Sequence, residues 1–122
     1  MEVPILKQGP HLIATVQSAL ADEDLVQLRD GLVESVGRYR AVGVIVDVTS
    51  LDVLDSFATR TLQDIAYMIR LRGAETVIVG IQPEVAFAMA QFGLRLEKVV
   101  TRLDLEEGLA YLNERGNSIA RR

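Results

Sequence analysis

The sequence contains no cysteine and no tryptophan, and His11 is its one histidine. Without cysteine the chain cannot form a disulfide, a thiolate nucleophile or a zinc–thiolate site, which fits a reducing compartment, with the cytoplasm as the default location. A single histidine leaves transition metals short of ligands and excludes a serine–histidine–aspartate triad for nucleophilic catalysis. We therefore expect no metal site, and we expect His11 to be a surface or strand-end residue.

Positive charge is also scarce, since 13 lysines and arginines face 17 aspartates and glutamates and the formal net charge is −4. Such a chain lacks the basic surface that binding to nucleic-acid phosphates needs, which argues against DNA and RNA partners. No apolar run approaches the roughly 18–20 residues of a membrane span, and residues 1–4 do not begin a signal peptide, so no membrane association is expected. The acidic residues lack calcium-loop spacing and the glycines lack phosphate-loop spacing, so no cofactor is expected.

What is present is sequence for a single domain, residues 1–122, of which 49% are hydrophobic. Apolar β-branched runs and helical apolar spacing alternate after an opening hairpin that turns at Gly9 and Pro10. The predicted strands are 5–6, 11–16, 44–48, 76–81 and 98–100. The predicted helices are 22–37, 56–72, one from Pro83 that Gly93 closes, and one that follows Asp104 and Glu107. This alternation predicts an α/β fold with a mixed, mostly parallel sheet of four to five strands and about four helices, and the polar residues 113–122 are expected to fray.

Polar side chains gather between the central strand and the second predicted helix, in residues 46–58. They are Asp47, Thr49, Ser50, Asp52, Asp55 and Ser56, and Phe57 follows them. In open α/β sheets, ligands and partners usually meet the edge formed by the carboxyl ends of the strands. This segment is therefore the candidate functional site.

Two interpretations of the segment stay open. In the first, Asp55 or Ser56 only caps the helix, Asp47 caps the strand end and Asp52 is a solvated turn residue. In the second, Ser56 accepts a phosphoryl group, because the free amides at a helix N-terminus stabilise a phosphate dianion. The carboxylates of Asp52 and Asp55 would then make the added charge repel a docked partner.

The remaining side chains of the segment have simpler expected roles. Thr49 and Ser50 are alternative phosphoacceptors, but we expect their hydroxyls to make local turn hydrogen bonds. Phe57 is either an anchor of the helix in the core or an exposed contact for a partner, and the core is favoured.

The run VIVDVT at residues 44–49, followed by LDSFA at 54–58, resembles the strand, loop and helix start of STAS domains, the anti-sigma factor antagonist family. The resemblance covers nearly the whole chain. It implies that Ser56, the serine after an aspartate, is the phosphorylation site. It also implies that Asp47 orients the loop by accepting hydrogen bonds from backbone or hydroxyl groups.

Within that family, residues 4–7, 81–83 and 103–109 resemble the short scaffold proteins of bacterial stressosomes. This resemblance implies a non-catalytic substrate that binds and sequesters a serine kinase until it is phosphorylated. It also implies assembly with a longer paralogue that carries a sensory domain, a serine phosphatase as a further partner, and control of an alternative sigma factor or another output. Phe57 and Ala58 stand where ordinary antagonists have a small residue and glycine, which argues against the alternative function, direct action on an anti-sigma kinase.

Two rival hypotheses come from other classes of protein. A phospho-aspartyl receiver would need an acidic pair after the first strand and a lysine at a later strand end, and residues 18–20 and 81–83 do not supply them. A plain assembly module would need no phosphorylation. Tyr67, Met68, Phe87 and Phe92 are more large apolar side chains than one small core can hold. Their excess predicts that the protein forms homo- or hetero-oligomers, whether or not it is phosphorylated.

Overall fold

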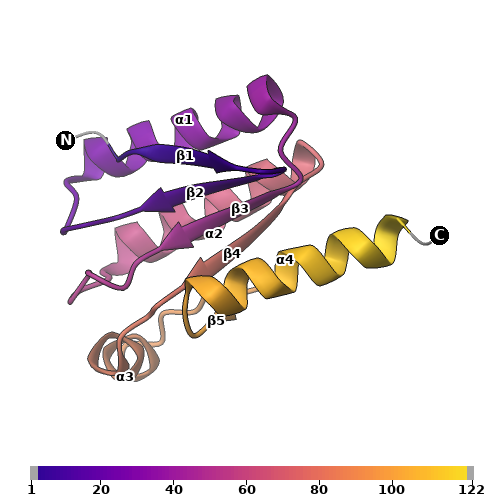
Figure 1. Ribbon diagram of the computed structural model, residues 1–122. Helices are drawn as coiled ribbons and strands as arrows, with labels where there is room; N and C mark the ends of the chain where they lie inside the picture. The colour runs from indigo at the N-terminus through magenta and orange to yellow at the C-terminus, as the bar shows by residue number, and fades with distance from the viewer. Residues whose placement is uncertain (1–2, 121–122) are drawn as a thin grey trace.

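The computed structural model describes residues 3–120. The strands are β1 (Ile5–Gln8), β2 (His11–Thr15), β3 (Gly43–Asp47), β4 (Glu75–Val79) and β5 (Val100–Arg102). The helices are α1 (Asp22–Tyr39), α2 (Ser56–Leu71), α3 (Pro83–Gln91) and α4 (Leu105–Ala120). Strands and helices alternate after the β1–β2 hairpin (Figure 1), so the predicted α/β class with four helices is confirmed.

The five strands lie in the sheet in the order in which they occur along the chain. β1 pairs antiparallel with β2 through a turn at Gly9, whose φ is 59°, and every later pair is parallel, as the predicted helical crossovers require. The register places Ile45 of β3 between Ile13 of β2 and Val77 of β4. A receiver domain has a doubly wound sheet whose strand order reverses at a switch point. The sequential order observed here is therefore not that of a receiver.

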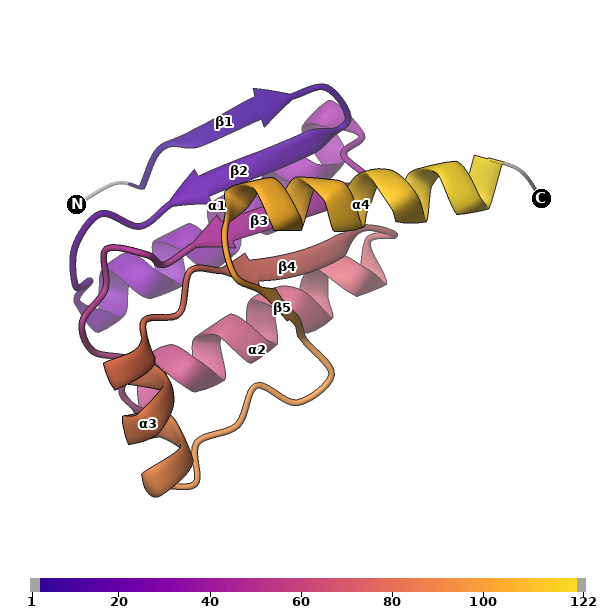
Figure 2. The same cartoon turned by 60° about the horizontal axis from the view of Figure 1, so that its bottom comes forward.

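Both faces of the sheet are covered, which explains the continuous β-branched runs of β3 and β4. α1 and α2 cover one face, and α4 covers the other (Figure 2). Val44 and Val46 belong to the core cluster that contains Leu62 of α2, whereas Ile45 belongs to the cluster that contains Leu112 of α4. Successive side chains of β3 thus enter opposite layers, as the pleat of a strand dictates.

α3 lies beyond the carboxyl ends of β2, β3 and β4 (Figure 1). Pro83 is at its first turn, where the missing proline N–H costs no helical hydrogen bond, and Val85 and Met89 are its buried residues. The loop from β3 to α2 leaves the same edge of the sheet, so this loop and α3 face each other. Within residues 3–120 no helix is long and apolar enough to cross a membrane.

The structure differs from the sequence prediction at the last strand. Residues 98–100 were the expected strand, but β5 begins at Val100, which pairs with Val77. Lys98 has a left-handed backbone, with φ of 61°, and the N–H of Val99 donates to the carbonyl of Leu96. A local turn therefore holds residues 98 and 99 out of the sheet.

His11 is at a strand end, as expected, but it is not a surface residue, because only 4% of it is exposed. It shares a face of β2 with Ile13, which packs in the cluster that contains Leu112 of α4. A Cβ atom built on Gly43 would lie 2.8 Å from Leu112 Cδ1 and 3.0 Å from His11 Cδ2, so both side chains close over this glycine. The fourth helix accounts for this burial, and it lies about a hundred residues further along the chain.

The polar residues from 113 onward also differ from the expectation of a frayed tail. α4 continues through them to Ala120, and residues 121–122 lie outside the described range. Arg115 of this last part forms an ion pair with Glu75 at 3.3 Å, which ties the helix to the start of β4.

Candidate functional site

The loop between β3 and α2 is held by a network that starts at Asp47. One carboxylate oxygen of Asp47, Oδ1, accepts the backbone N–H of Thr49 at 2.9 Å and the Thr49 hydroxyl at 2.5 Å. The carbonyl of Thr49 in turn accepts the side-chain amide of Gln82 at 2.6 Å. Asp47 thus accepts two hydrogen bonds from the loop, which supports its expected orienting role, and Gln82 links the loop to the chain that enters α3.

Gly80 allows the chain after β4 to approach Thr49 closely. It follows β4, its φ is 83°, and a Cβ atom there would overlap the Thr49 hydroxyl. An L-residue at this position would meet both the strained backbone and the Thr49 side chain. Only glycine therefore lets the two loops approach each other as they do.

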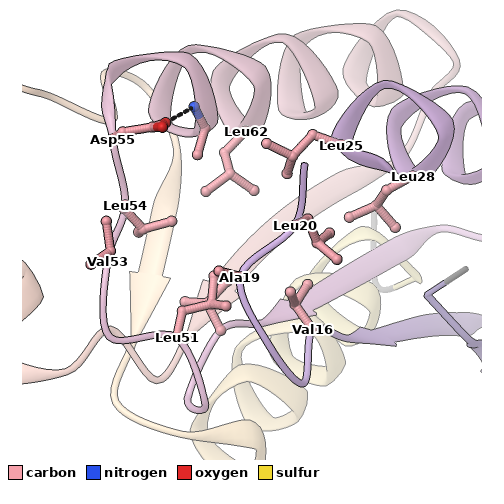
Figure 3. A pocket seen from close by; sticks show the side chains of 12 residues that line it. Val16, Ala19, Leu20, Leu25, Leu28, Leu51, Val53, Leu54, Asp55 and Leu62 are labelled. Carbon is pink, nitrogen blue, oxygen red and sulfur yellow. Dashed lines mark hydrogen bonds between the residues drawn. The ribbon is translucent and has the colours of Figure 1, made fainter. Parts of the chain in front are cut away.

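The inner side of the β3–α2 loop is apolar. Leu51 and Leu54 are each 7% exposed, and they face Leu20, Leu25 and Leu62 around a small cavity of about 70 Å³ (Figure 3). Burial of leucine side chains stabilises a segment by roughly 1.5–3 kcal/mol each. The loop is thus fixed by its own core contacts on one side and presents its polar residues on the other.

Ser56 is the first residue of α2 and is exposed. The helix cap is Asp55, not Ser56: its carboxylate accepts the N–H of Ala58 at 2.8 Å, and its carbonyl accepts the N–H of Thr59 at 2.9 Å. In the described part of the chain the amides of Ser56 and Phe57 have no acceptor. A group on the Ser56 hydroxyl would therefore lie beside two free donors at a helix N-terminus, which favours negative charge.

The charges around Ser56 are of both signs. Asp52 and Asp55 are exposed carboxylates on the loop side. Arg60 is exposed one helical turn further along α2, at the spacing of four residues that brings side chains together on a helix. Sequence reasoning missed Arg60, although its spacing from Ser56 was the available signal. The site can therefore both attract a phosphate through Arg60 and repel a partner through the aspartates.

A groove runs beside Ser56, between the loop and α3. It has a volume of about 580 Å³, and apolar side chains make up most of its wall. The loop contributes Asp52, Val53, Leu54, Asp55 and Ser56, and the chain around α3 contributes Val85, Ala88, Phe92 and Leu94. Val53 and Phe92 are 61% and 74% exposed. The sequence could not indicate this groove, because its walls are some thirty residues apart in the chain.

The other candidate residues have different surroundings. Phe57 is half-buried and packs against the main core cluster, so the favoured interpretation is confirmed. The Thr49 hydroxyl donates to the Asp47 side chain rather than to the backbone, and Ser50 is exposed. Of the four residues expected to be surplus to the core, Tyr67, Phe87 and Phe92 are exposed, whereas Met68 is half-buried. Among residues 3–120 no three histidine or acidic side chains are grouped so that they could hold a metal ion.

The protein is an α/β domain with a sequential sheet whose first strand is antiparallel, two helices on one face, one helix on the other, and a polar loop that leads into a capped helix. The chain belongs to the STAS domain family, which matches residues 2–108. A serine-to-glutamate variant of RsbS from Moorella thermoacetica is 31% identical, covers 98% of both chains and superposes with a TM-score of 0.78.

Two further proteins are similar to this chain. A chain in a solved structure of the stressosome is 30% identical, and the match covers 93% of this chain and 98% of that chain with a TM-score of 0.74. The RsbT co-antagonist protein RsbRA of Bacillus subtilis (strain 168) is 28% identical over 98 residues, which are 80% of this chain. The match spans about a third (34%) of the length of RsbRA. The chain is thus a STAS domain that is similar over nearly its whole length to RsbS and to a chain of the stressosome structure.

Proposed function

We propose that the protein is a non-catalytic signalling scaffold of a stressosome-type complex, and that it binds and sequesters a serine kinase. Phosphorylation of Ser56 switches this binding, a serine phosphatase reverses the phosphorylation, and release of the kinase regulates an alternative sigma factor or another output pathway. The observation that carries the proposal is the geometry of Ser56: it is exposed, it begins α2 beside two free amides, and it lines an apolar groove. The similarity to RsbS supports the same assignment.

The groove beside Ser56 provides the docking surface in this proposal. Apolar side chains that a small domain leaves exposed next to one another mark interfaces, and Val53 and Phe92 are of this kind. A partner seated there covers Ser56, so a phosphate of about −1.5 to −2 charge is placed within the interface. The neighbouring carboxylates of Asp52 and Asp55 add to the repulsion.

The rest of the structure does not change on phosphorylation in this proposal, because Ser56 is exposed in the first turn of a helix whose cap is supplied by Asp55. The modified chain keeps its fold and its contacts with the longer STAS paralogue. It loses only the kinase.

Intact-mass measurement after incubation with a candidate serine kinase and ATP tests the modification. We expect one stable phosphate on the wild-type chain and on Ser50→Ala, which is a matched serine on the same loop, and none on Ser56→Ala. A phosphate on Thr49 or Ser50 with Ser56 unmodified would overturn the site. An adduct that is labile, as an acyl phosphate is, would also overturn it.

A kinase pull-down tests the switch. The wild-type chain and Ser56→Ala should retain the kinase, the phosphorylated chain should release it, and Ser56→Asp should release it only in part, because a carboxylate has less charge and fewer acceptor oxygens than a phosphate. Equal retention by all four forms would reject the proposal.

Light scattering tests the scaffold. We expect the chain to form oligomers alone or with a longer STAS paralogue, and phosphorylation to leave them intact. A strict monomer in both conditions would remove the scaffold function.

A further inference from the structure

A polar pocket lies at the opposite end of β4 from Ser56. β5 pairs with β4 only from Val77 onward, so the edge of β4 is open at Glu75 and Thr76. Figure 2 shows this end of β4 between the last turns of α2 and the middle of α4. A pocket of about 280 Å³ is present there, and its polar wall consists of Arg70, Glu75, Thr76, Lys98 and Arg115.

The charge of this pocket is opposite to that of the whole chain. Three cationic side chains and one carboxylate line it, in a protein whose formal net charge is −4. The three cations come from α2, from the turn before β5 and from α4. The acidic surface of the protein repels anions, whereas a basic pocket attracts them, so an anion should bind in this pocket in preference to the rest of the surface.

Two of the cations are held in place, Arg70 by a hydrogen bond and Arg115 by an ion pair. Arg70 Nη2 donates to the carbonyl of Lys98 at 2.8 Å, and Arg115 Nη2 lies 3.3 Å from Glu75 Oε2. The other oxygen of Glu75 accepts the hydroxyl of Tyr111 at 2.9 Å, so this carboxylate is already partnered on both oxygens. The ammonium of Lys98 has no partner among the described residues. Each arginine keeps further N–H donors for a ligand.

Thr76 supplies an independent observation. It lines the pocket and is 5% exposed, and its hydroxyl is the one enclosed side-chain oxygen without a hydrogen-bond partner in the described part of the chain. An enclosed hydroxyl without a partner costs about 1–3 kcal/mol. An anionic oxygen at the inner wall would give it an acceptor.

We propose that this pocket binds a small anion that carries a phosphate group, either inorganic phosphate or the phosphate monoester of a small molecule. Arg70, Lys98 and Arg115 supply charge-assisted hydrogen bonds and Thr76 supplies a neutral one. The volume exceeds what one phosphate ion fills and lies near the lower end of small-molecule sites, which favours a monoester over the free ion. The pocket is separate from the Ser56 site, so the result does not depend on the proposed kinase switch.

Titration of the full chain with inorganic phosphate, glycerophosphate and uncharged glycerol tests the proposal, with amide NMR shifts as the readout at constant pH and ionic strength. We expect saturable shifts around Thr76 and Lys98 with glycerophosphate, weaker binding of phosphate, and none with glycerol. Tighter binding of inorganic phosphate than of glycerophosphate would overturn the choice of a monoester. No saturable shift at these residues with either anion in the millimolar range would overturn the site.

Matched variants distinguish a specific binding site from general charge attraction. Lys98→Gln should weaken glycerophosphate binding by about tenfold, whereas Lys7→Gln, the same change on β1 at the far edge of the sheet, should leave it unchanged. Thr76→Val should weaken binding while keeping or raising the melting temperature of the free protein, because it removes the enclosed hydroxyl. Equal effects of Lys98→Gln and Lys7→Gln would reject the proposal, and so would unchanged affinity in Thr76→Val.

Discussion

Gly80, at the end of β4, lies directly against the hydroxyl of Thr49 in the β3–α2 loop. This contact joins the loop that carries Ser56 to the chain that enters α3. The groove beside Ser56 has one wall from each of these two segments. The shape of the groove therefore depends on a residue that does not line it.

Gly80→Ala should destabilise the protein by about 1–3 kcal/mol and loosen the Thr49 loop, because alanine meets both a strained backbone and the Thr49 hydroxyl. Urea denaturation and amide hydrogen exchange measure the two effects. Gly93→Ala is the control, since Gly93 also has a positive φ, 71°, but has open space around it. Similar loop exchange in both variants would show that the contact with Thr49 contributes nothing.

Leu62→Ala should lower the free energy of unfolding by about 2–5 kcal/mol, because Leu62 is 2% exposed and packs between the sheet and the loop. Leu71→Ala makes the same change at the end of the same helix, where the side chain is 69% exposed, and should cost far less. Urea denaturation measures both variants. A loss below about 1 kcal/mol for Leu62→Ala would contradict the packing of α2.

Asp55→Ala should destabilise α2 by about 0.5–2 kcal/mol, because it removes the side-chain acceptor of the Ala58 N–H. Ser56→Ala, one residue away, should change the free energy of unfolding by less than this, since Ser56 is not the cap. Thermal denaturation of the two variants gives the comparison. A larger loss for Ser56→Ala would mean that its hydroxyl has a structural role.

Phosphorylation of Ser56 should raise the melting temperature more in the wild-type chain than in Arg60→Gln. A phosphate four residues before an arginine on one helix forms a favourable pair that stabilises the helix by about 0.2–0.5 kcal/mol. Arg38→Gln, an exposed change on α1, serves as the control and should behave as wild type. An equal shift in Arg60→Gln and the wild type would exclude the pair.

Stability should fall as the pH drops below neutral, because of His11. Burial lowers the pKa of His11 from its ordinary value of 6.5. Below pH 6.5 the unfolded chain takes up a proton that the folded chain does not, so protonation stabilises the unfolded state. The free energy of unfolding therefore falls until the pH reaches the pKa of His11 in the folded chain. His11→Gln should show a smaller slope of unfolding free energy between about pH 5 and 7, where free carboxylates stay charged. Equal slopes would show that His11 does not cause the loss.

Local patterns were sufficient to predict most of the elements. Apolar residues at helical spacing located α2, and its observed end, Leu71, is one residue from the expected one. The β-branched run at 44–48 located β3, because burial on both faces leaves no polar alternation. The predicted last strand, 98–100, lies two residues before the observed β5, because only the pairing with β4 decides which of several neighbouring residues enter the sheet.

The candidate site was predictable in its polar half only. The acceptor role of Asp47 is local, so a serine- and threonine-rich turn two residues further along could indicate it. The hydrogen bond from Gln82 to Thr49 joins residues 33 apart, and no local pattern reports such a contact. The same reason hid the burial of His11 and the basic pocket, whose walls come together only in the folded chain.

The order of the sheet also bears on how the protein is made. Each new strand, as it leaves the ribosome, finds its neighbour already synthesised and at the growing edge, because strands one to five lie side by side in chain order. No strand has to wait for a later one to be inserted between it and its partner. Assembly can therefore advance in the direction of translation, and α4, which follows all five strands in the chain, covers the remaining open face of the sheet.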